Sequence, residues 1–513
     1  MNRVKTASGG KFEPFGRPIF PKPSARSLKR VGVVDVGSNS VRMVVFDGAA
    51  RSPAYFYNEK VMAGLGDGLA RTGILNPKGV ERALSALRRF ALIADAMEIE
   101  QLTCVATAAV REAANGDEFR REVEKQTGLK LWVVSGEEEA NLSAQGVALG
   151  WPEASGLVCD IGGSSMELAE LSGGKVGRCV TSPLGPFRLQ QVEGGDKALK
   201  KHIAGIVEGL AAEMGTDHDT IFLVGGSWRA IARLDMERTG YPMTVLHEYR
   251  MNPAAIDETV NWIAESDPNE LRSRVGISSA RMELVPLASK VLRQLVETFQ
   301  PKEIAISSYG IREGMLYEQM STALRKRDPL IEAARFSEKQ MSRMPGFGKK
   351  LYAFLQPLFA DVTPERDRLI RAACLLHDTA WRAHPDYRAD ACFDNVTRAN
   401  MAAISHPERV FVGLALLHRY KNSRNNSPMA PLFKLLTDEQ IRDAEVLGKA
   451  MRFGAMFAVK DPESAGTLKF NDKTNTLRLN LTKKGRALFG EVADARFRSL
   501  AGSLNATAEV QGI

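Results

Sequence analysis

Two short segments of this chain share an order of residue types that suits phosphate binding. The first runs from Asp35 to Met43 (DVGSNSVRM) and the second from Asp160 to Leu168 (DIGGSSMEL). In each, Asp and a branched residue precede Gly, small or polar residues ending in Ser follow, and an apolar–charged–apolar triplet closes the segment. The backbone N–H groups of such turns bind anions. Gly37 and Gly162 would let the turns adopt backbone angles that a residue with a Cβ atom disfavours. The segments therefore predict two phosphate-binding turns.

Each turn joins two apolar runs that predict β-strands. Residues 31–34 and 44–46 flank the first turn, and residues 156–159 and 168–171 flank the second. A strand, a tight turn and a second strand thus occur twice, which indicates a duplicated unit. The alternative is a pair of ordinary hairpins with small residues in their turns, and the repetition argues against it.

Side chains at the turns supply further groups for a phosphate-bearing ligand. Short hydroxyl and amide side chains lose little conformational entropy when they bind. A third segment, Gly225-Gly226-Ser227, follows a predicted buried strand at 221–224 and would cradle more phosphate or a purine. The phosphate-binding candidates in these three segments are Asp35, Gly37, Ser38, Asn39, Ser40, Gly162, Gly163, Ser164, Ser165, Gly225, Gly226 and Ser227.

Four further motifs narrow the assignment. They are TAAVREAAN at 107–115, SGEEEA at 135–140, VGGS at 224–227 and SSYGIREG at 307–314. In this order, and with the paired turns, they resemble the exopolyphosphatase and guanosine pentaphosphate phosphatase (Ppx/GppA) family, most closely over residues 31–320. The paired turns also resemble the actin, hexokinase and heat-shock ATPase architecture. The resemblance implies an α/β fold in which two ribonuclease H-like halves face a cleft.

The resemblance also implies where the general base lies. Arg111-Glu112-Ala113 matches the family motif that carries the catalytic glutamate, so Glu112 is expected to accept the proton of the attacking water. It follows a predicted apolar strand, where burial would raise the pKa of its carboxyl group and make it a better proton acceptor. From its position alone, Glu112 would instead favour the start of the following helix through its charge.

Two carboxylates of the second turn are expected to act on a metal ion. Asp160 and Glu167 are seven residues apart across the turn, so both can face the same cleft. The resemblance makes them catalytic carboxylates that hold a metal ion and a water, with Asp35 as a further candidate ligand. The expected cofactor is Mg²⁺ or another divalent cation, which would offset the charge of a phosphoanhydride.

Two arginines are assigned to phosphate binding by the same resemblance. Arg42 lies on the strand after the first turn, at a position that would otherwise face solvent. Arg281 matches less well, because the family usually has Ala-Asp after this arginine where this chain has Met282-Glu283. The acidic run Glu137-Glu138-Glu139 opens a predicted helix, where negative charge is favourable, and no role is assigned to it.

The chain is predicted to have four parts. A basic disordered tail (residues 1–30) precedes two halves of the actin-like ATPase type (31–135 and 136–320), and a mainly helical domain with a small hairpin (321–513) follows. In the last part, His377-Asp378 resembles the metal-binding pair of HD phosphohydrolases. No His between His247 and His377 supplies the upstream ligand, so we expect an HD-like fold with a degenerate site.

Charge and cysteine content narrow the ligand class and the compartment. The chain has 513 residues and a net charge of +8, and residues 1–30, 31–320 and 321–513 carry net charges of +7, −9 and +10. Basic parts around an acidic half suggest a polyanionic ligand. Five Cys without a CxxC pair suggest reduced thiols, and no apolar run is long enough to span a bilayer. We expect a cytoplasmic protein with no membrane and no specific nucleic-acid partner.

Four functions are compatible with these features. The first is an exopolyphosphatase that removes terminal orthophosphate from inorganic polyphosphate, and the second removes the 5′ γ-phosphate of guanosine pentaphosphate, or one protein has both activities. The third is a non-catalytic binder of polyphosphate or of guanosine penta- or tetraphosphate, which the catalytic carboxylates disfavour. The fourth is a sugar kinase or actin-like ATPase, which would use a cleft Asp as base where this chain offers Glu112. We favour the first, acting as a homodimer.

Overall fold

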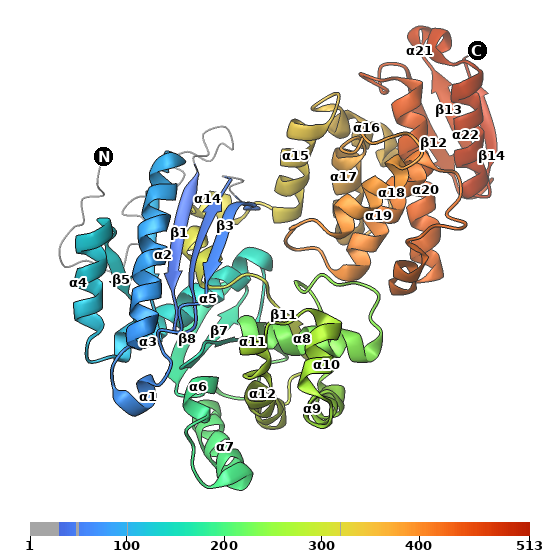
Figure 1. The fold of residues 1–513 in the computed structure, drawn as a ribbon. Helices are drawn as coiled ribbons and strands as arrows, with labels where there is room; N and C mark the ends of the chain where they lie inside the picture. The colour runs from blue at the N-terminus through green and yellow to red at the C-terminus, as the bar shows by residue number, and fades with distance from the viewer. Residues whose placement is uncertain (1–29, 48–50, 100, 319, 513) are drawn as a thin grey trace. The chain divides into compact units, whose positions relative to one another are not determined.

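The structure, a computed structural model, describes residues 30–47, 51–99, 101–318 and 320–512. These residues form two compact units, an N-terminal unit up to Arg327 and a C-terminal unit from Asp328, coloured from blue to yellow and from yellow to red in Figure 1. The predicted basic tail, apart from Arg30, lies outside the described residues. None of the helices in the described ranges is long and apolar enough to cross a membrane.

The N-terminal unit contains two mixed sheets with the same strand pattern (Figure 1). The first has the order β3-β2-β1-β4-β5, in which β3, β2 and β1 are antiparallel neighbours and β4 and β5 run parallel to β1. The second has the order β10-β11-β9-β6-β7-β8, and its run from β8 to β11 repeats that pattern. The duplicated α/β fold is therefore confirmed. The strands are β1 (Val31–Val36), β2 (Val41–Phe46), β3 (Tyr55–Val61), β4 (Gln101–Ala106), β5 (Leu131–Val133), β6 (Gly156–Ile161), β7 (Met166–Ser172), β8 (Lys175–Ser182), β9 (Thr220–Val224), β10 (Arg250–Met251) and β11 (Glu303–Ile306).

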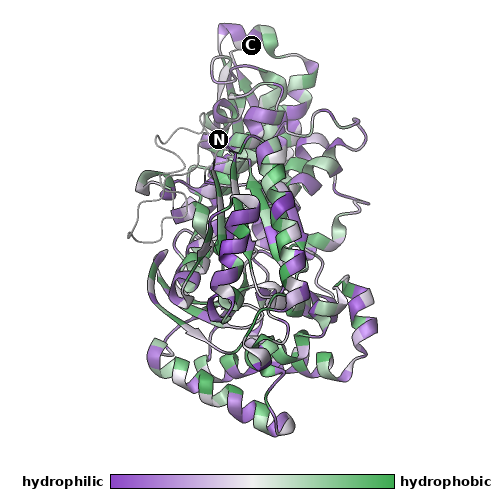
Figure 2. Cartoon of the chain, turned by 60° about the vertical axis from the view of Figure 1, so that its left-hand side comes forward, coloured by the Kyte–Doolittle hydropathy of each residue, from purple (hydrophilic) through white to green (hydrophobic). Residues whose placement is uncertain are grey.

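Helices pack on both sheets and complete two buried clusters, one that includes Phe90 and one that includes Trp228. α2 begins after Asn76, whose side chain accepts a backbone hydrogen bond, with Pro77 in the first turn, as expected at a helix start. Figure 2 shows hydrophilic and hydrophobic residues alternating along the helices, which is typical of helices with one face in a core. The helices of this unit are α1 (Leu69–Thr72), α2 (Pro77–Ala96), α3 (Ala108–Glu112), α4 (Gly116–Thr127), α5 (Gly136–Gly150), α6 (Pro186–Leu189), α7 (Gly195–Met214), α8 (Gly226–Thr239), α9 (Ile256–Glu265), α10 (Pro268–Val275), α11 (Ser279–Met282), α12 (Val285–Phe299), α13 (Ile311–Glu318) and α14 (Thr322–Arg325), with a 3₁₀ turn η2 (Pro253–Ala255).

Two of these helices approach each other closely because glycine allows it. α5 packs along α13, and a Cβ added at Gly314 of α13 would overlap the carbonyl oxygen of Leu142 in α5. α13 also returns to the first sheet, where Arg312 NH1 lies 3.4 Å from Asp35 Oδ2. α13, near the end of the N-terminal unit, therefore contacts both α5 and the first strand.

We expect Gly314→Ala to destabilise the protein by about 1–3 kcal/mol or more, because the new methyl group meets backbone that cannot move aside. The matched control is Gly209→Ala in α7, where an added Cβ meets no atom within 4 Å. That change is expected to be neutral or to stabilise by about 0.5–1 kcal/mol, since Ala is the better helix former. Urea unfolding of the two variants measures the difference, and equal midpoints would contradict the packing argument.

The C-terminal unit is mainly helical and ends in a three-stranded sheet of order β12-β13-β14. The predicted helical runs and the predicted hairpin are present. The sequence patterns do not predict β14, which pairs parallel to β13, because its five residues carry little apolar signal. The elements are α15 (Pro329–Met341), α16 (Phe347–Leu355), η3 (Gln356–Leu358), α17 (Pro364–Leu376), α18 (Arg388–Thr397), α19 (His406–Tyr420), η4 (Ala430–Leu435), α20 (Asp438–Phe457), β12 (Gly466–Asn471), β13 (Thr476–Leu481), α21 (Lys483–Leu488), α22 (Glu491–Ser503) and β14 (Thr507–Gln511).

Candidate active site

The two predicted turns have the same geometry and contact each other. Each turn is closed by a hydrogen bond from the N–H of its first Gly to the carbonyl of its last Ser, at 3.0 Å in the first and 2.9 Å in the second. The strands on either side pair in the same register. The hydroxyl of Ser164 donates to the hydroxyl of Ser38 at 3.0 Å. The turns of the two halves therefore meet at one place.

The reason expected for glycine in these turns is wrong, because neither Gly37 nor Gly162 has a positive φ. A Cβ at either residue would lie 3.5 Å from its nearest neighbour, which is an ordinary contact. Gly225 does adopt such a conformation, with φ of 117°, and a Cβ there would lie 2.6 Å from the Ile161 carbonyl oxygen. Glycine is thus required where the third loop approaches the second turn.

The turns line a cavity of about 210 Å³ in the N-terminal unit. Of the residues predicted to bind phosphate, Ser164 does not line it, because its side chain is buried against Ser38. Predicted residues that line the cavity are Asp35, Gly37, Ser38, Asn39, Ser40, Arg42, Asp160, Gly162, Gly163, Ser165, Gly225, Gly226, Ser227 and Arg281. Lining residues with functional groups that the sequence patterns do not assign are Lys60, Thr107, Glu139, Arg229 and Arg312.

Five cationic side chains surround the cavity, namely Arg42, Lys60, Arg229, Arg281 and Arg312. Burial and then repulsion from neighbouring arginines lower the pKa of Arg42, and lower that of Arg229 to about 10. Burial also acts against the charge of Arg312, but nearby carboxylates outweigh it and the pKa of Arg312 is raised. A cluster of like charges is unfavourable without an anion, so this cavity suits a ligand with several negative charges.

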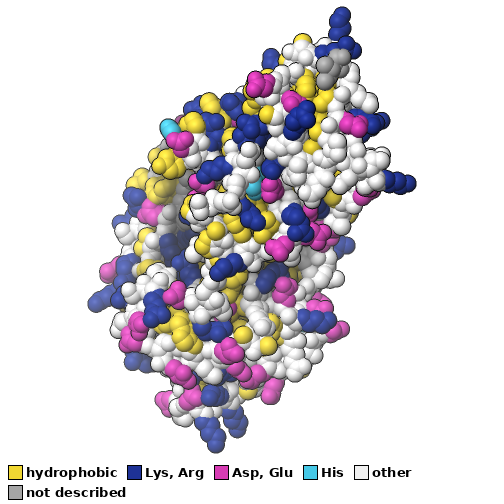
Figure 3. All heavy atoms as spheres, turned by 90° about the vertical axis from the view of Figure 1, so that its right-hand side faces the viewer, with side chains coloured by type: hydrophobic (Ala, Val, Ile, Leu, Met, Phe, Trp, Pro, Cys, Tyr) yellow, Lys and Arg dark blue, Asp and Glu magenta, His cyan; other side chains and the backbone are white. Residues whose placement is uncertain are grey.

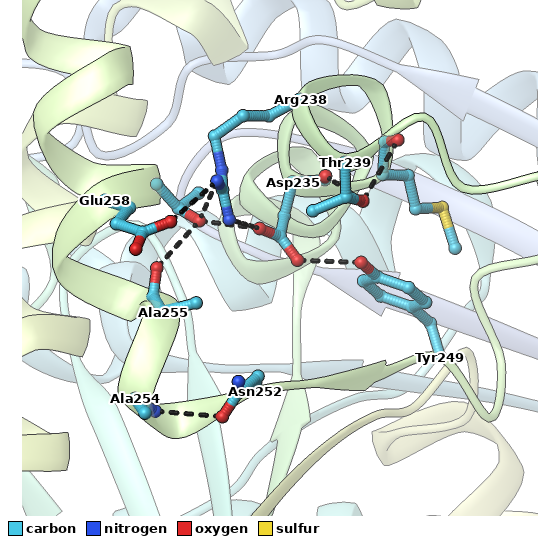
Figure 4. A network of polar contacts seen from close by, with 10 residues as sticks. Asp235, Arg238, Thr239, Tyr249, Asn252, Ala254, Ala255 and Glu258 are labelled. Carbon is cyan, nitrogen blue, oxygen red and sulfur yellow. Dashed lines mark hydrogen bonds and ion pairs between the residues drawn. The ribbon is translucent and has the colours of Figure 1, made fainter.

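α8 carries Arg229 to the cavity and is held near its other end by a buried polar network (Figure 4). Asp235 accepts hydrogen bonds from Tyr249 at 2.7 Å, from Thr259 at 2.6 Å and from Arg238 at 3.2 Å. A buried network whose members are satisfied makes its surroundings rigid. The network therefore fixes α8 on the second sheet and positions Arg229.

Lys60 is a cavity side chain whose charge is expected to depend on pH. Burial, followed by repulsion from the four cavity arginines, lowers the pKa of Lys60 to about 8. The ammonium group is therefore charged at neutral pH, and its attraction for phosphate is lost as the pH rises through about 8. We expect the dissociation constant of a polyanionic phosphate ligand such as tripolyphosphate to increase between pH 7 and 9.5 in the wild type and to increase less in Lys60→Gln. Because the ligand's own terminal phosphate titrates equally with both proteins, identical pH profiles of the dissociation constant would exclude this role for Lys60.

Three carboxylates, Asp35, Glu139 and Asp160, also line the cavity. Burial raises the pKa of all three. For Glu139, burial outweighs the effect of Arg111, whose NH1 lies 3.0 Å from Glu139 Oε2, and raises the pKa to about 8. The Ser143 hydroxyl donates to Asp160 Oδ2. Glu139 is thus an oriented carboxylate in the cavity, and its raised pKa makes its ionised form a stronger proton acceptor.

Two of the predicted catalytic carboxylates, Glu167 and Glu112, do not line the cavity. Glu167 is 1% exposed, its Oε1 accepts a hydrogen bond from Thr181 at 3.0 Å, and its Oε2 is buried without a partner. Of Asp160 and Glu167, only Asp160 lines the cavity. Glu112 ends α3 and forms an ion pair with Arg188 of α6, so that it connects the two halves.

The start of α5 explains why Glu139, rather than its acidic neighbours, reaches the cavity. Ser135 Oγ accepts a hydrogen bond from the Glu138 N–H at 3.1 Å, and the Glu138 carboxylate accepts one from the Ser135 N–H at 2.7 Å. This capping box assigns Glu138 to the helix end, and Glu137 is exposed. Glu139 is 9% exposed and lies on the face that also carries Ser143, four residues later. The Ser-x-x-Glu pattern is the sequence signal that identifies this arrangement.

The HD-like pair of the C-terminal unit is bonded to protein groups. Arg343 donates to Asp378 through NH2 to Oδ1 at 2.6 Å and through Nε to Oδ2 at 2.9 Å. His377 Nδ1 lies 2.9 Å from the Cys374 carbonyl oxygen, and burial lowers the pKa of His377 to about 4. Among the described residues, no three His, Cys, Asp or Glu side chains form a group that could hold a metal ion. A guanidinium thus contacts the carboxylate that a metal contacts in an HD site.

Two glycine turns of a duplicated α/β unit, facing an arginine-rich cavity, define an actin-like phosphate-binding fold. The profile of the Ppx/GppA phosphatase family matches residues 44–323, and the exopolyphosphatase C-terminal profile matches residues 340–509. The chain therefore belongs to the Ppx/GppA phosphatase family, which implies a hydrolase that acts on phosphoanhydride bonds.

The chain is also similar to curated proteins and to solved structures. Exopolyphosphatase 1 of Mycobacterium tuberculosis is 24% identical over 305 residues, which cover 57% of this chain and 89% of that protein. Retrograde regulation protein 2 of Saccharomyces cerevisiae is 25% identical over 430 residues, which cover 76% of this chain and 72% of that protein. The crystal structure of an exopolyphosphatase from Cytophaga hutchinsonii shares the fold, with a TM-score of 0.52, 22% identity, and coverage of 56% of this chain and 97% of that chain.

Proposed function

We propose that this protein is an exopolyphosphatase that releases terminal orthophosphate from inorganic polyphosphate, with Glu139 as the general base. The observation that carries the proposal is the cavity itself. It combines two phosphate-binding turns, five cationic side chains and an oriented carboxylate in one place. Hydrolysis of a phosphoanhydride requires this combination, because the reaction depends on positioning, on offsetting charge and on a base for the attacking water.

Each group has a defined task in the proposed reaction. The turn N–H groups and the cavity arginines bind the phosphate oxygens and offset the charge that develops on them. Glu139 takes a proton from the water as the water oxygen attacks the terminal phosphorus. The bond from that phosphorus to the bridging oxygen breaks, so that orthophosphate and a chain one phosphate shorter are released. Arg111 holds the Glu139 carboxylate through NH1 at 3.0 Å and keeps it directed. We propose Glu139 rather than Glu112 because only Glu139 lines the cavity.

The oxygen donors of the cavity fit a divalent cation such as Mg²⁺. Burial raises the pKa of Asp35 and Asp160, so a bound cation would stabilise their charged forms. Mg²⁺ usually takes one or two carboxylates and completes its shell with water and substrate phosphates. We propose Asp160 as its ligand and Asp35 as a second one, with Glu167 supporting Asp160 across the hairpin. When bound, the ion would supply positive charge to the phosphate oxygens.

The lining of the cavity favours polyphosphate over a nucleotide. None of the described residues that line it is aromatic, so a guanine base would find no ring to stack on there. Guanosine pentaphosphate remains the second candidate substrate, because its terminal phosphates present the same oxygens to the same turns. Guanosine tetraphosphate would bind through the same groups.

The test is a comparison of kcat/KM on the two substrates with purified full-length protein and Mg²⁺. We expect the value on long-chain polyphosphate to exceed the value on guanosine pentaphosphate. A higher value on guanosine pentaphosphate would assign the second function, and binding of either compound without orthophosphate release would assign a non-catalytic role.

We further propose a cytoplasmic homodimer. The five cysteines are free, and Cys104, Cys159, Cys374 and Cys392 are buried, which suits a reducing compartment. Light scattering of the purified protein across a concentration series tests the assembly, and a mass of one chain throughout would exclude the dimer.

A further inference from the structure

Glu313 is a buried carboxylate beside the cavity that has no task in the proposed reaction. It is the third residue of α13, is 0% exposed, and does not line the cavity. Its Oε2 accepts a hydrogen bond from the Gly310 N–H at 2.8 Å, and its Oε1 accepts one from the Tyr55 hydroxyl of β3 at 2.9 Å. Both oxygens accept, as in an ionised carboxylate, and both donors are neutral. Such a buried charge requires a positive partner nearby.

Arg312 supplies this partner and is shared between two carboxylates. Its Nε lies 4.0 Å from Glu313 Oε1, and its NH1 lies 3.4 Å from Asp35 Oδ2. Its Nε is buried without a hydrogen-bond partner. Burial acts to lower the pKa of Arg312, but the charges of Glu313 and then Asp35 outweigh it, so the pKa is raised. The guanidinium therefore lies between two carboxylates without a short hydrogen bond to either.

This arrangement differs from the ion pairs of the protein surface. Acidic and basic side chains intermingle on the face drawn in Figure 3, where water screens their interaction. The side chains of Arg312 and Glu313 are 11% and 0% exposed, so their charges are screened much less. A small displacement of the guanidinium would therefore strongly change the charge that Asp35 presents to the cavity.

We propose that Glu313 is a positioning residue that draws Arg312 away from Asp35, so that Asp35 can hold the divalent cation of the proposed reaction. The inference rests on the metal site proposed above, in which Asp35 is the second ligand. Arg312 and a cation would compete for this carboxylate, because both are positive and both contact its oxygens. Displaced towards Glu313, Arg312 gains an acceptor for its Nε, and its other N–H groups remain available for phosphate oxygens.

The experiment is a titration of the full-length protein with Mn²⁺ in the absence of substrate, in which electron paramagnetic resonance measures the free ion. Mn²⁺ prefers the same oxygen ligands as Mg²⁺. We expect Glu313→Gln to bind Mn²⁺ about 10-fold more weakly and Arg312→Gln to bind it about 10-fold more tightly. Gln can still accept the Gly310 N–H, as it does in capping boxes, so Glu313→Gln removes the charge and keeps the helix cap. The matched control is Glu170→Gln, whose carboxylate pairs with Arg178 at 3.4 Å outside the cavity lining, and it should bind Mn²⁺ like the wild type.

The double variant Arg312→Gln/Glu313→Gln separates positioning from a general effect of charge. If Glu313 acts through Arg312, Glu313→Gln changes the Mn²⁺ affinity by less than about 2-fold once Arg312 is replaced. An equal effect with and without Arg312 would overturn the proposal, because Glu313 would then act on the ion directly.

Tyr55→Phe carries the same test if Glu313→Gln does not fold. Loss of the phenol leaves Glu313 Oε1 open to Arg312, so Mn²⁺ should bind more tightly, and only while Arg312 is present. Unchanged or weaker binding in Tyr55→Phe would contradict the positioning role.

Asp35→Asn distinguishes a failure of this inference from a failure of the proposed function. We expect this variant to bind Mn²⁺ at least about 10-fold more weakly and to lose its sensitivity to Arg312→Gln. Unchanged Mn²⁺ binding would remove Asp35 from the metal site and overturn the inference, whereas the proposed hydrolase is judged separately by orthophosphate release from polyphosphate. Absence of that release together with the expected Mn²⁺ titrations would refute the hydrolase and support the positioning of Arg312.

Discussion

Replacing Glu139 by Gln is expected to lower kcat on polyphosphate by about 10²–10⁴-fold, the usual effect of removing a general base. Gln has nearly the same shape and keeps a hydrogen-bond acceptor for Arg111, which lies 3.0 Å from the Glu139 carboxylate. It cannot accept a proton from water. Substrate binding should therefore change little, and steady-state kinetics should show a fall in kcat with a nearly constant KM.

The matched control is Glu112→Gln, which also removes one glutamate carboxylate. Because Glu112 pairs with Arg188 away from the cavity lining, we expect less than about a 10-fold loss of kcat, in line with the value of a partly exposed ion pair. If Glu112→Gln abolished turnover and Glu139→Gln did not, the base would be Glu112 and the proposed assignment would be wrong.

Replacing Asp160 by Asn is expected to have the second largest effect, through the metal ion. Asp160 lines the cavity and Ser143 donates to its Oδ2, so the carboxylate is fixed towards the phosphate turns. Losing its charge should raise the Mg²⁺ concentration needed for half-maximal activity by at least about 10–100-fold, which is the range seen when even supporting groups of a metal site are removed. A titration of activity with Mg²⁺ at saturating substrate measures this shift.

The control for Asp160 is Thr181→Val, which removes the hydrogen bond to Glu167 at 3.0 Å without touching the cavity lining. We expect a smaller shift in the Mg²⁺ requirement, because Glu167 acts through Asp160. An unchanged requirement in Asp160→Asn would remove this carboxylate from the metal site.

Local sequence patterns predicted the parts of the site that are local in the chain. The two turns occur where they were expected, because strand, Gly and Ser follow one another within nine residues and fix the hairpin register. Arg229 and Arg312 could not be assigned in this way. Arg229 follows the third predicted segment by two residues and Arg312 lies within the motif at 307–314, but each is on a helix, and the local pattern does not show which helix residue faces the cavity.

The proposed general base illustrates the limit of assignment by motif. Glu112 and Glu139 both follow a strand of the first sheet, and a motif match alone favoured the former. The capping box at Ser135 and Glu138 distinguishes them, because it turns Glu139 towards the interior. Glu112 ends a five-residue helix, so its side chain extends to Arg188 of the other half.

In the C-terminal unit, the helical spacing of apolar residues predicted the helices. The contacts of the HD-like pair, His377-Asp378, could not be predicted, because they depend on a residue that is distant in the sequence. Asp378 is bound by Arg343, which lies 35 positions earlier, just after α15. The sequence shows that an upstream His is missing, and the structure shows which side chain contacts Asp378. A guanidinium there supplies positive charge to the carboxylate.

The most direct test of the account is orthophosphate release from long-chain polyphosphate, followed over time with chain-length analysis of the remaining polymer. With the wild type and Mg²⁺, we predict that orthophosphate is the small product from the first time point, and that Glu139→Gln releases it at least about 100-fold more slowly. Equal rates in the two proteins, or shortened chains that appear without orthophosphate, would contradict terminal hydrolysis at this cavity.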